Sequence, residues 1–93
     1  MDVVLNHGAE INLATLGDED RRKVYAWMDH LRNWEKDSYV RSRSMKIDVP
    51  GPEEVFVLKT STDLRIFFVL HATCLEVTDI ARQSSLEKVR QAS

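Results

Sequence analysis

Three cationic side chains stand within or at the end of apolar segments in the second half of the sequence: Lys59, Arg65 and Arg82. Arg65 is the most unusual of them, because the other residues of its segment LRIFF are leucine, isoleucine and phenylalanine. Arginine and lysine form strong, charge-assisted hydrogen bonds with phosphate groups. If the three side chains share a surface with apolar residues, that surface could grip a phosphate while a nucleobase or a side chain packs beside it.

The register of two neighbouring strands decides whether Lys59 and Arg65 meet. Successive side chains of a strand point to opposite faces of its sheet. A turn with an odd number of residues, with Lys59 opposite Asp63, places the large apolar residues of segments 54–59 and 64–71 on one face. Lys59 and Arg65 then lie on the other face. We prefer this register because an even turn would mix large apolar and cationic side chains on both faces.

A third strand-like segment covers residues 75–81 and leads to Arg82. A two-residue turn at residues 72 and 73 keeps its apolar side chains level with those of the preceding strand. If the alternation continues without interruption, Ile80 and Arg82 fall on the face of the first two cations. The sequence therefore predicts that three cations from three strands converge on the face turned away from the helices.

A purely structural role for these residues is the alternative. Arg65 could form an ion pair with Asp63, Glu76 or Asp79 on an exposed sheet face, where such pairs contribute little to stability. His71 falls on the same face at the end of the arginine strand, and its imidazole suits acid–base chemistry near neutral pH. An exposed histidine without a catalytic role is the simpler interpretation.

The remaining pattern predicts an α+β fold in a single domain, residues 1–93. Residues 2–5 predict a short strand, residues 8–17 a helix that ends at Gly17, and Asp18 the N-cap of a second helix. In the second helix apolar residues recur every three or four positions, which indicates one buried face. These residues are Val24, Trp27, Met28, Leu31 and Trp34.

Residues 36–54 predict a polar connector that ends in the turn-forming Pro50-Gly51-Pro52. Three strands follow and form an antiparallel meander, which the helix hairpin covers on one face. The strands are expected over residues 54–59, 64–71 and 75–81. Residues 84–91 predict a last, short helix.

Composition and charge narrow the class of protein. The 93 residues suffice for one domain, and 43% hydrophobic residues argue against wholesale disorder. The net charge of −2 disfavours a broad nucleic-acid-binding surface. Segment 38–47 nevertheless contains Arg41, Arg43 and Lys46 and no acid, which leaves a focused phosphate- or RNA-binding site open.

The cysteine content and the length of the apolar runs indicate the cellular compartment of the protein. Cys74 is the single cysteine and fits a reducing compartment. No apolar run approaches the ~20 residues that cross a bilayer, and no Cys/His cluster has the spacing of metal ligands. We therefore expect a cytoplasmic protein that binds no membrane, metal or cofactor.

The order of these segments resembles the RelE/ParE superfamily, the toxins of type II toxin–antitoxin systems. In that family a strand ending in lysine precedes an aromatic-or-leucine, Arg, hydrophobic, hydrophobic, aromatic run, here Leu64-Arg65-Ile66-Phe67-Phe68. A later strand leads into an Ile-x-Arg element, here Ile80-Ala81-Arg82. The resemblance covers nearly the whole chain, is strongest from Val55 to Lys88, and implies a RelE-like fold.

RelE-like members cleave messenger RNA in the decoding site of the ribosome, where the 2′-hydroxyl attacks the adjacent phosphate. The resemblance implies that Arg65 stabilises the developing negative charge and that Lys59 shares this task or assists proton transfer. Arg82 would bind the scissile phosphate or the leaving group. It also implies catalysis by preorganised cations without a cofactor, and a cognate antitoxin as partner besides the ribosome and mRNA.

Three features depart from the usual RelE-like pattern. The position of an earlier strand lysine is Val57, and the chain is slightly acidic. The C-terminal stretch SSLEKVRQ lacks the usual tyrosine, for which Lys88 could substitute only as a cation. Two alternatives therefore stay open. One is a ParE-like inhibitor of DNA gyrase, and the other is a catalytically degenerate toxin that mainly binds its antitoxin.

Overall fold

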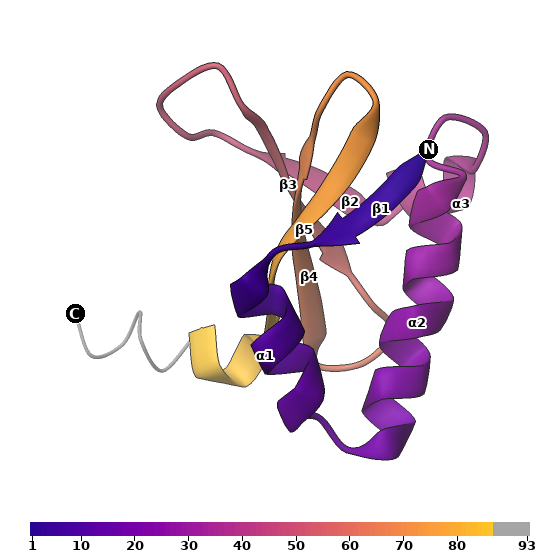
Figure 1. Ribbon diagram of the computed structural model, residues 1–93, viewed down its shortest axis with the longest axis vertical. Helices are drawn as coiled ribbons and strands as arrows, with labels where there is room; N and C mark the ends of the chain where they lie inside the picture. Colours follow the sequence, from indigo (N-terminus) through magenta and orange to yellow (C-terminus); the bar gives the residue numbers. More distant parts are fainter. Residues whose placement is uncertain (87–93) are drawn as a thin grey trace.

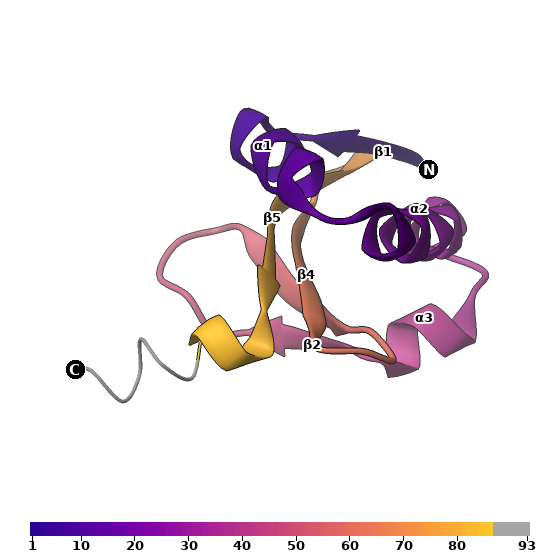
Figure 2. The same cartoon turned by 90° about the horizontal axis from the view of Figure 1, so that it is seen from below.

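A computed structural model describes residues 1–86 of the protein. In chain order the elements are β1 (Asp2–Leu5), α1 (His7–Thr15), α2 (Asp18–Arg32), α3 (Ser38–Ser42), β2 (Ser44–Ile47), β3 (Glu54–Lys59), β4 (Leu64–Leu70) and β5 (Cys74–Arg82). Helices α1, α2 and α3 gather on one side of a strongly twisted sheet, apart from a short helical turn over residues 83–86 (Figure 1, Figure 2). We call that side the covered face, and the side that α1, α2 and α3 leave uncovered the open face.

The five strands of the sheet are ordered β1-β5-β4-β3-β2. The antiparallel meander of β3, β4 and β5 is confirmed, with β3 at its predicted bounds and the other two strands within one residue of theirs. β1 is also confirmed, and it pairs in parallel with β5 at one edge. At the other edge β2 pairs with β3, so the sheet is two strands wider than the predicted meander.

The prediction of a continuous polar connector over residues 36–54 was wrong, because this segment contains α3 and β2. The side chain of Asp37 caps α3 by accepting a hydrogen bond from the Val40 amide at 3.1 Å. The segment SMKI of β2 has little strand signal of its own, but Met45 lies opposite Val57 in the ladder with β3. Pairing with a strongly strand-forming neighbour decides its conformation.

The residues that begin and end α1 and α2 lie one or two positions from their predicted places. Asn6 caps α1 by accepting a hydrogen bond from the Ala9 amide at 2.8 Å. The N-cap of α2 is Gly17, not Asp18. Asp18 instead begins the helix, where its charge still interacts favourably with the helix dipole.

The predicted apolar face of α2 forms the centre of the core. Four of its five residues are buried there, together with side chains of α1, α3 and the covered face of the sheet. Trp34 lies just beyond the helix and packs edge-on against Phe56 and Phe68, with ring centroids 5.3 and 5.4 Å away. Phe56 and Phe68 stack on each other at 5.3 Å. This aromatic cluster fastens the end of α2 to β3 and β4.

The register of β3 and β4 keeps the predicted separation of faces, although the predicted partner was wrong. Lys59 lies opposite Arg65 rather than opposite Asp63. The connection between the two paired residues therefore has five residues instead of three. Because both numbers are odd, Leu58, Ile66 and their apolar neighbours still share the covered face, and both cations share the open face.

A β-bulge in β5 overturns the predicted position of Arg82. The register with β4 shifts between Phe67 and Phe68, so that Thr78 is an extra residue in β5. Beyond an extra residue the alternation changes face. Ile80 therefore lies opposite Ile66 and is buried in the core, and Arg82 lies opposite Leu64.

Candidate functional site: the open face of the sheet

Lys59 and Arg65 form a like-charged pair on the open face, at the ends of β3 and β4 that adjoin the connection between them. They are directly opposite in the ladder, where side chains of an antiparallel pair are ~5 Å apart at Cβ. Like charges in such a position destabilise a sheet. An anion held between them would turn the repulsion into a favourable interaction, so the pair is the strongest indication of an anion-binding site.

Within residues 1–86 Arg65 forms none of the ion pairs with Asp63, Glu76 or Asp79 that were considered for a structural role. Its Nη1 donates to the carbonyl oxygens of Thr62 and Leu64 at 3.0 and 2.9 Å. Within residues 1–86 it forms no salt bridge, and Asp63 instead accepts hydrogen bonds from the amide and hydroxyl of Ser84. Two carbonyls thus orient the guanidinium and leave its charge uncompensated in this part of the chain.

Lys59 is exposed, and its side chain forms no ion pair within the described range. Its backbone is held firmly, because the Lys59 amide donates to the Arg43 carbonyl at 2.9 Å. A shallow hollow of about 200 Å³ adjoins it. The hollow is lined by Ser42, Arg43, Ser44, Met45 and Lys59.

Arg82, the third predicted cation, is not brought together with the pair. The bulge turns it to the covered side, where its Nη2 lies 2.7 Å from Oδ2 of Asp20 in the first turn of α2. The residue opposite Arg65 on β5 is Ala81. The predicted convergence of Arg82 with Lys59 and Arg65 was therefore wrong, and among these three cations only Lys59 and Arg65 share the open face.

The predicted basic segment does not form one cluster either. Arg43 is half-buried, and its Nε and Nη2 donate to the carbonyls of Lys59 and Thr60 at 2.8 and 3.0 Å, with the guanidinium over the Trp27 ring. Arg41 is exposed and donates to the Trp34 carbonyl. Lys46 lies opposite Phe56, on the covered side of the edge strand, with Glu54 4.0 Å away. Arg43 thus positions the Lys59 end of β3.

The two additional candidates lie apart from the pair or outside the described residues. His71 follows β4 at its far end, six residues or roughly 20 Å from Arg65. Its Nε2 is 2.9 Å from Oε1 of Glu76. Lys88 lies outside residues 1–86. His71 therefore cannot act on a group bound between Lys59 and Arg65.

A cluster on the helical layer was not foreseen from the sequence. The Nδ1–H of His30 donates to Oδ2 of Asp37 at 2.6 Å, while the imidazole packs against Trp27 and Tyr39. The hydrogen bond from His30, followed by that from the Val40 amide, holds the pKa of Asp37 below its usual range. Because α2 supplies the histidine and α3 the capped turn, no local pattern revealed this contact.

No group of three or more His, Cys, Asp or Glu side chains within residues 1–86 is arranged to hold a metal ion. Over the same range, none of the helices has both the length and the apolar character needed to cross a membrane.

Comparison with known proteins identifies the fold. No protein-family model matches the sequence, and no curated protein matches it. Among solved structures, the chain is similar to one in the crystal structure of the archaeal RelE–RelB complex from Pyrococcus horikoshii OT3, with a TM-score of 0.68. The similarity covers 88% of this chain and 93% of that chain at 13% sequence identity.

The chain has a RelE-like fold. This finding confirms the fold expected from the Lys, Leu-Arg-x-x-Phe and Ile-x-Arg segments, although so low an identity concerns the backbone and not the active residues. In the RelE-like fold of this chain, Lys59 and Arg65 occupy adjacent strands of the open face. Their roles, like those of the other candidate residues, stay predictions.

Proposed function

We propose that this RelE-like chain is the toxin of a type II toxin–antitoxin module and cleaves mRNA on the ribosome. The observation that carries the proposal is the directly opposed pair Lys59 and Arg65, which has no carboxylate partner within residues 1–86. A phosphate bridging the two cations would remove their mutual repulsion. The RelE-like fold adds the expectation of a cognate antitoxin as partner.

The proposed reaction is attack of the RNA 2′-hydroxyl on the adjacent phosphorus. The 2′-hydroxyl gives up its proton to water, the bond to the 5′-oxygen of the next nucleotide breaks, and this oxygen takes up a proton, so that a cyclic phosphate and a 5′-hydroxyl result. Arg65, held by two carbonyls, stabilises the negative charge that develops on the phosphoryl oxygens. Lys59 shares that charge or protonates the leaving oxygen. Because two carbonyls already orient the Arg65 guanidinium, this group needs little reorganisation in the transition state.

The test is mapping of mRNA 5′ ends in a bacterial translation reaction with ribosomes. We expect cuts inside translated codons with the unchanged protein and a roughly 100-fold loss of cutting with Arg65→Ala, the typical cost of deleting one preorganised donor. Arg22→Ala is the matched control, because Arg22 is an exposed arginine on α2, remote from the open face. Intact mRNA in the presence of folded, unchanged protein would contradict the proposal.

A toxin that acts by binding alone is the second candidate, and the position of Arg82 favours it. With Arg82 held by Asp20 on the covered side, Lys59 and Arg65 are the two of the three predicted cations that lie on the open face of the described residues. Such a protein would inhibit DNA gyrase in the manner of ParE, or would mainly bind its antitoxin. If mRNA stays intact, a DNA supercoiling assay with purified gyrase distinguishes these two possibilities.

A further inference from the structure

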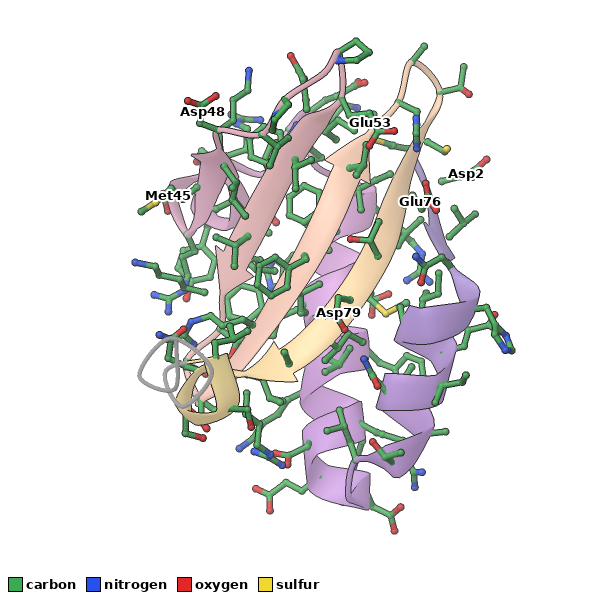
Figure 3. The ribbon with its side chains drawn as sticks, turned by 90° about the vertical axis from the view of Figure 1, so that its left-hand side faces the viewer. Asp2, Met45, Asp48, Glu53, Glu76 and Asp79 are labelled. Atoms are coloured by element: carbon green, nitrogen blue, oxygen red, sulfur yellow. The ribbon has the colours of Figure 1, made fainter. Side chains whose placement is uncertain are left out.

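The open face carries opposite charges at its two ends. Lys59 and Arg65 mark one end. At the other end Glu76 lies opposite Val69, four residues or ~13 Å along β4 from Arg65. Figure 3 looks onto this face, with α2 behind the sheet, and shows Glu76 on β5 towards this end, Glu53 beyond it, and Asp79 further along β5, where it lies opposite Phe67. An RNA strand could follow the cationic end only, because carboxylates border the remainder.

In the middle of the open face, β3 and β4 carry apolar side chains, Asp79 of β5 lies opposite Phe67, and no helix within residues 1–86 covers them. Phe67, Val55 and Val57 are half-buried there without belonging to the main core. Val69 is only 4% exposed and likewise lies outside that core cluster. Met45 extends the apolar surface at the β2 edge and is 54% exposed (Figure 3). Apolar surface of this kind usually marks an interaction site.

We propose that two copies of this chain associate through their open faces in a two-fold symmetric dimer. A two-fold interface must be self-complementary. If one residue of the first copy contacts a second residue of the other copy, the same two residues are also in contact with the copies exchanged. An axis near Phe67 satisfies this requirement, because it superposes the cationic end of one copy on the acidic end of the other. Lys59 and Arg65 of each copy then face Glu76 of its partner, and the apolar middles pack together.

The local partners of the acidic groups leave Glu76 available for this role. Oδ1 of Asp79 already accepts hydrogen bonds from Nδ2 of Asn12 at 2.6 Å and from the Ile80 amide at 2.8 Å. Within residues 1–86 the Glu76 carboxylate has one such contact, to His71 at 2.9 Å. A carboxylate has two oxygens and can accept from His71 and from an arginine at the same time.

The size of the face predicts a weak, reversible dimer. Four strands and about five residues along each give an outline of roughly 350 Å². A standard stable interface buries ~800 Å² per partner. We therefore expect a monomer–dimer equilibrium that shifts towards the monomer as salt screens the charges.

The dimer regulates the site described above, because it covers Lys59 and Arg65. This consequence rests on the proposed function, whereas the dimer itself can be tested without it. A phosphate chain and the partner's Glu76 compete for the same two cations. RNA and self-association thus exclude each other, and association holds the free protein inactive at high concentration.

Reversal of charges tests the arrangement most directly. Lys59→Glu/Arg65→Glu makes both ends of the face acidic, and Glu76→Arg makes both ends cationic. Measured by analytical ultracentrifugation over a concentration series, each variant alone should associate at least about tenfold more weakly than the unchanged chain. An equimolar mixture should recover association, because every opposed pair is then attractive. Recovery also shows that both variants are folded.

Substitution of aspartate for two exposed apolar residues, one on the open face and one on α1, provides the control for this experiment. Met45→Asp places a charge on the open face, and Ile11→Asp places one at a similarly exposed position of α1, at 51% exposure. We expect the first to weaken association and the second to leave it unchanged. A chain that stays monomeric at all concentrations, or a mixture of charge-reversed variants that does not associate, overturns the dimer. In that event loss of cleavage with Arg65→Ala would still support the proposed function.

Discussion

Both faces of β3 and β4 carry apolar side chains, but the two faces differ in what surrounds those side chains. On the covered face Leu58, Ile66 and Phe68 are completely buried beneath the helices. On the open face the adjacent Val57 and Phe67 are half-buried and lie between charged ends. Neighbouring residues of one strand thus serve different purposes: the covered face supplies stability, and the open face supplies a surface for binding.

The largest expected effect is on the free energy of unfolding, when each of two adjacent phenylalanines on opposite faces of β4 is replaced by alanine. Phe68→Ala should lower the free energy of unfolding by about 3–5 kcal/mol, because it leaves a cavity among buried side chains. Phe67→Ala removes the same group from the open face and should cost roughly 1 kcal/mol, since water can occupy the space. Urea unfolding of both variants measures the difference. Equal losses would mean that the open face is covered by part of the same chain.

The contact between His30 of α2 and Asp37, the cap of α3, predicts how stability depends on pH. The depressed pKa of Asp37, caused first by the hydrogen bond from His30, favours the folded state while the carboxylate is ionised. This contribution is complete above the unfolded-state pKa of about 3.8 and is lost as pH falls through the lower folded-state value. Asp37→Asn should therefore flatten the decline of thermal stability below pH 4. An unchanged acid profile would contradict the role of this pair.

The smallest expected effect concerns Arg82 on the covered side. A double-mutant cycle with Arg82→Ala and Asp20→Ala should give a coupling of about 0.2–1 kcal/mol in unfolding free energy, typical of a partly exposed ion pair. mRNA cleavage by Arg82→Ala should stay near that of the unchanged protein, in contrast to Arg65→Ala. Loss of cleavage with Arg82→Ala would instead place this arginine in contact with RNA, as the sequence motif suggested.

Local patterns were sufficient for most of the elements. The spacing of apolar residues predicted α2 and its buried face, and the apolar runs between turns predicted β3, β4 and β5. Weaker segments were missed where neighbours decide the outcome. β2 forms because β3 offers it a ladder, and α3 is held by Asp37 with help from His30 of another helix.

The candidate site also contains one part that local sequence patterns predicted and one part that they did not. The sequence by itself determined that Lys59 and Arg65 share a face, because any odd-length connection between their strands gives that result. Only the tertiary structure decided on which face of the sheet Arg82 lies. One extra residue, Thr78, reverses the alternation in β5, and the bulge appears only when the strand must pair with β4 and also bury Ile80 beneath the helices. Such a choice depends on contacts between distant segments, which no local pattern encodes.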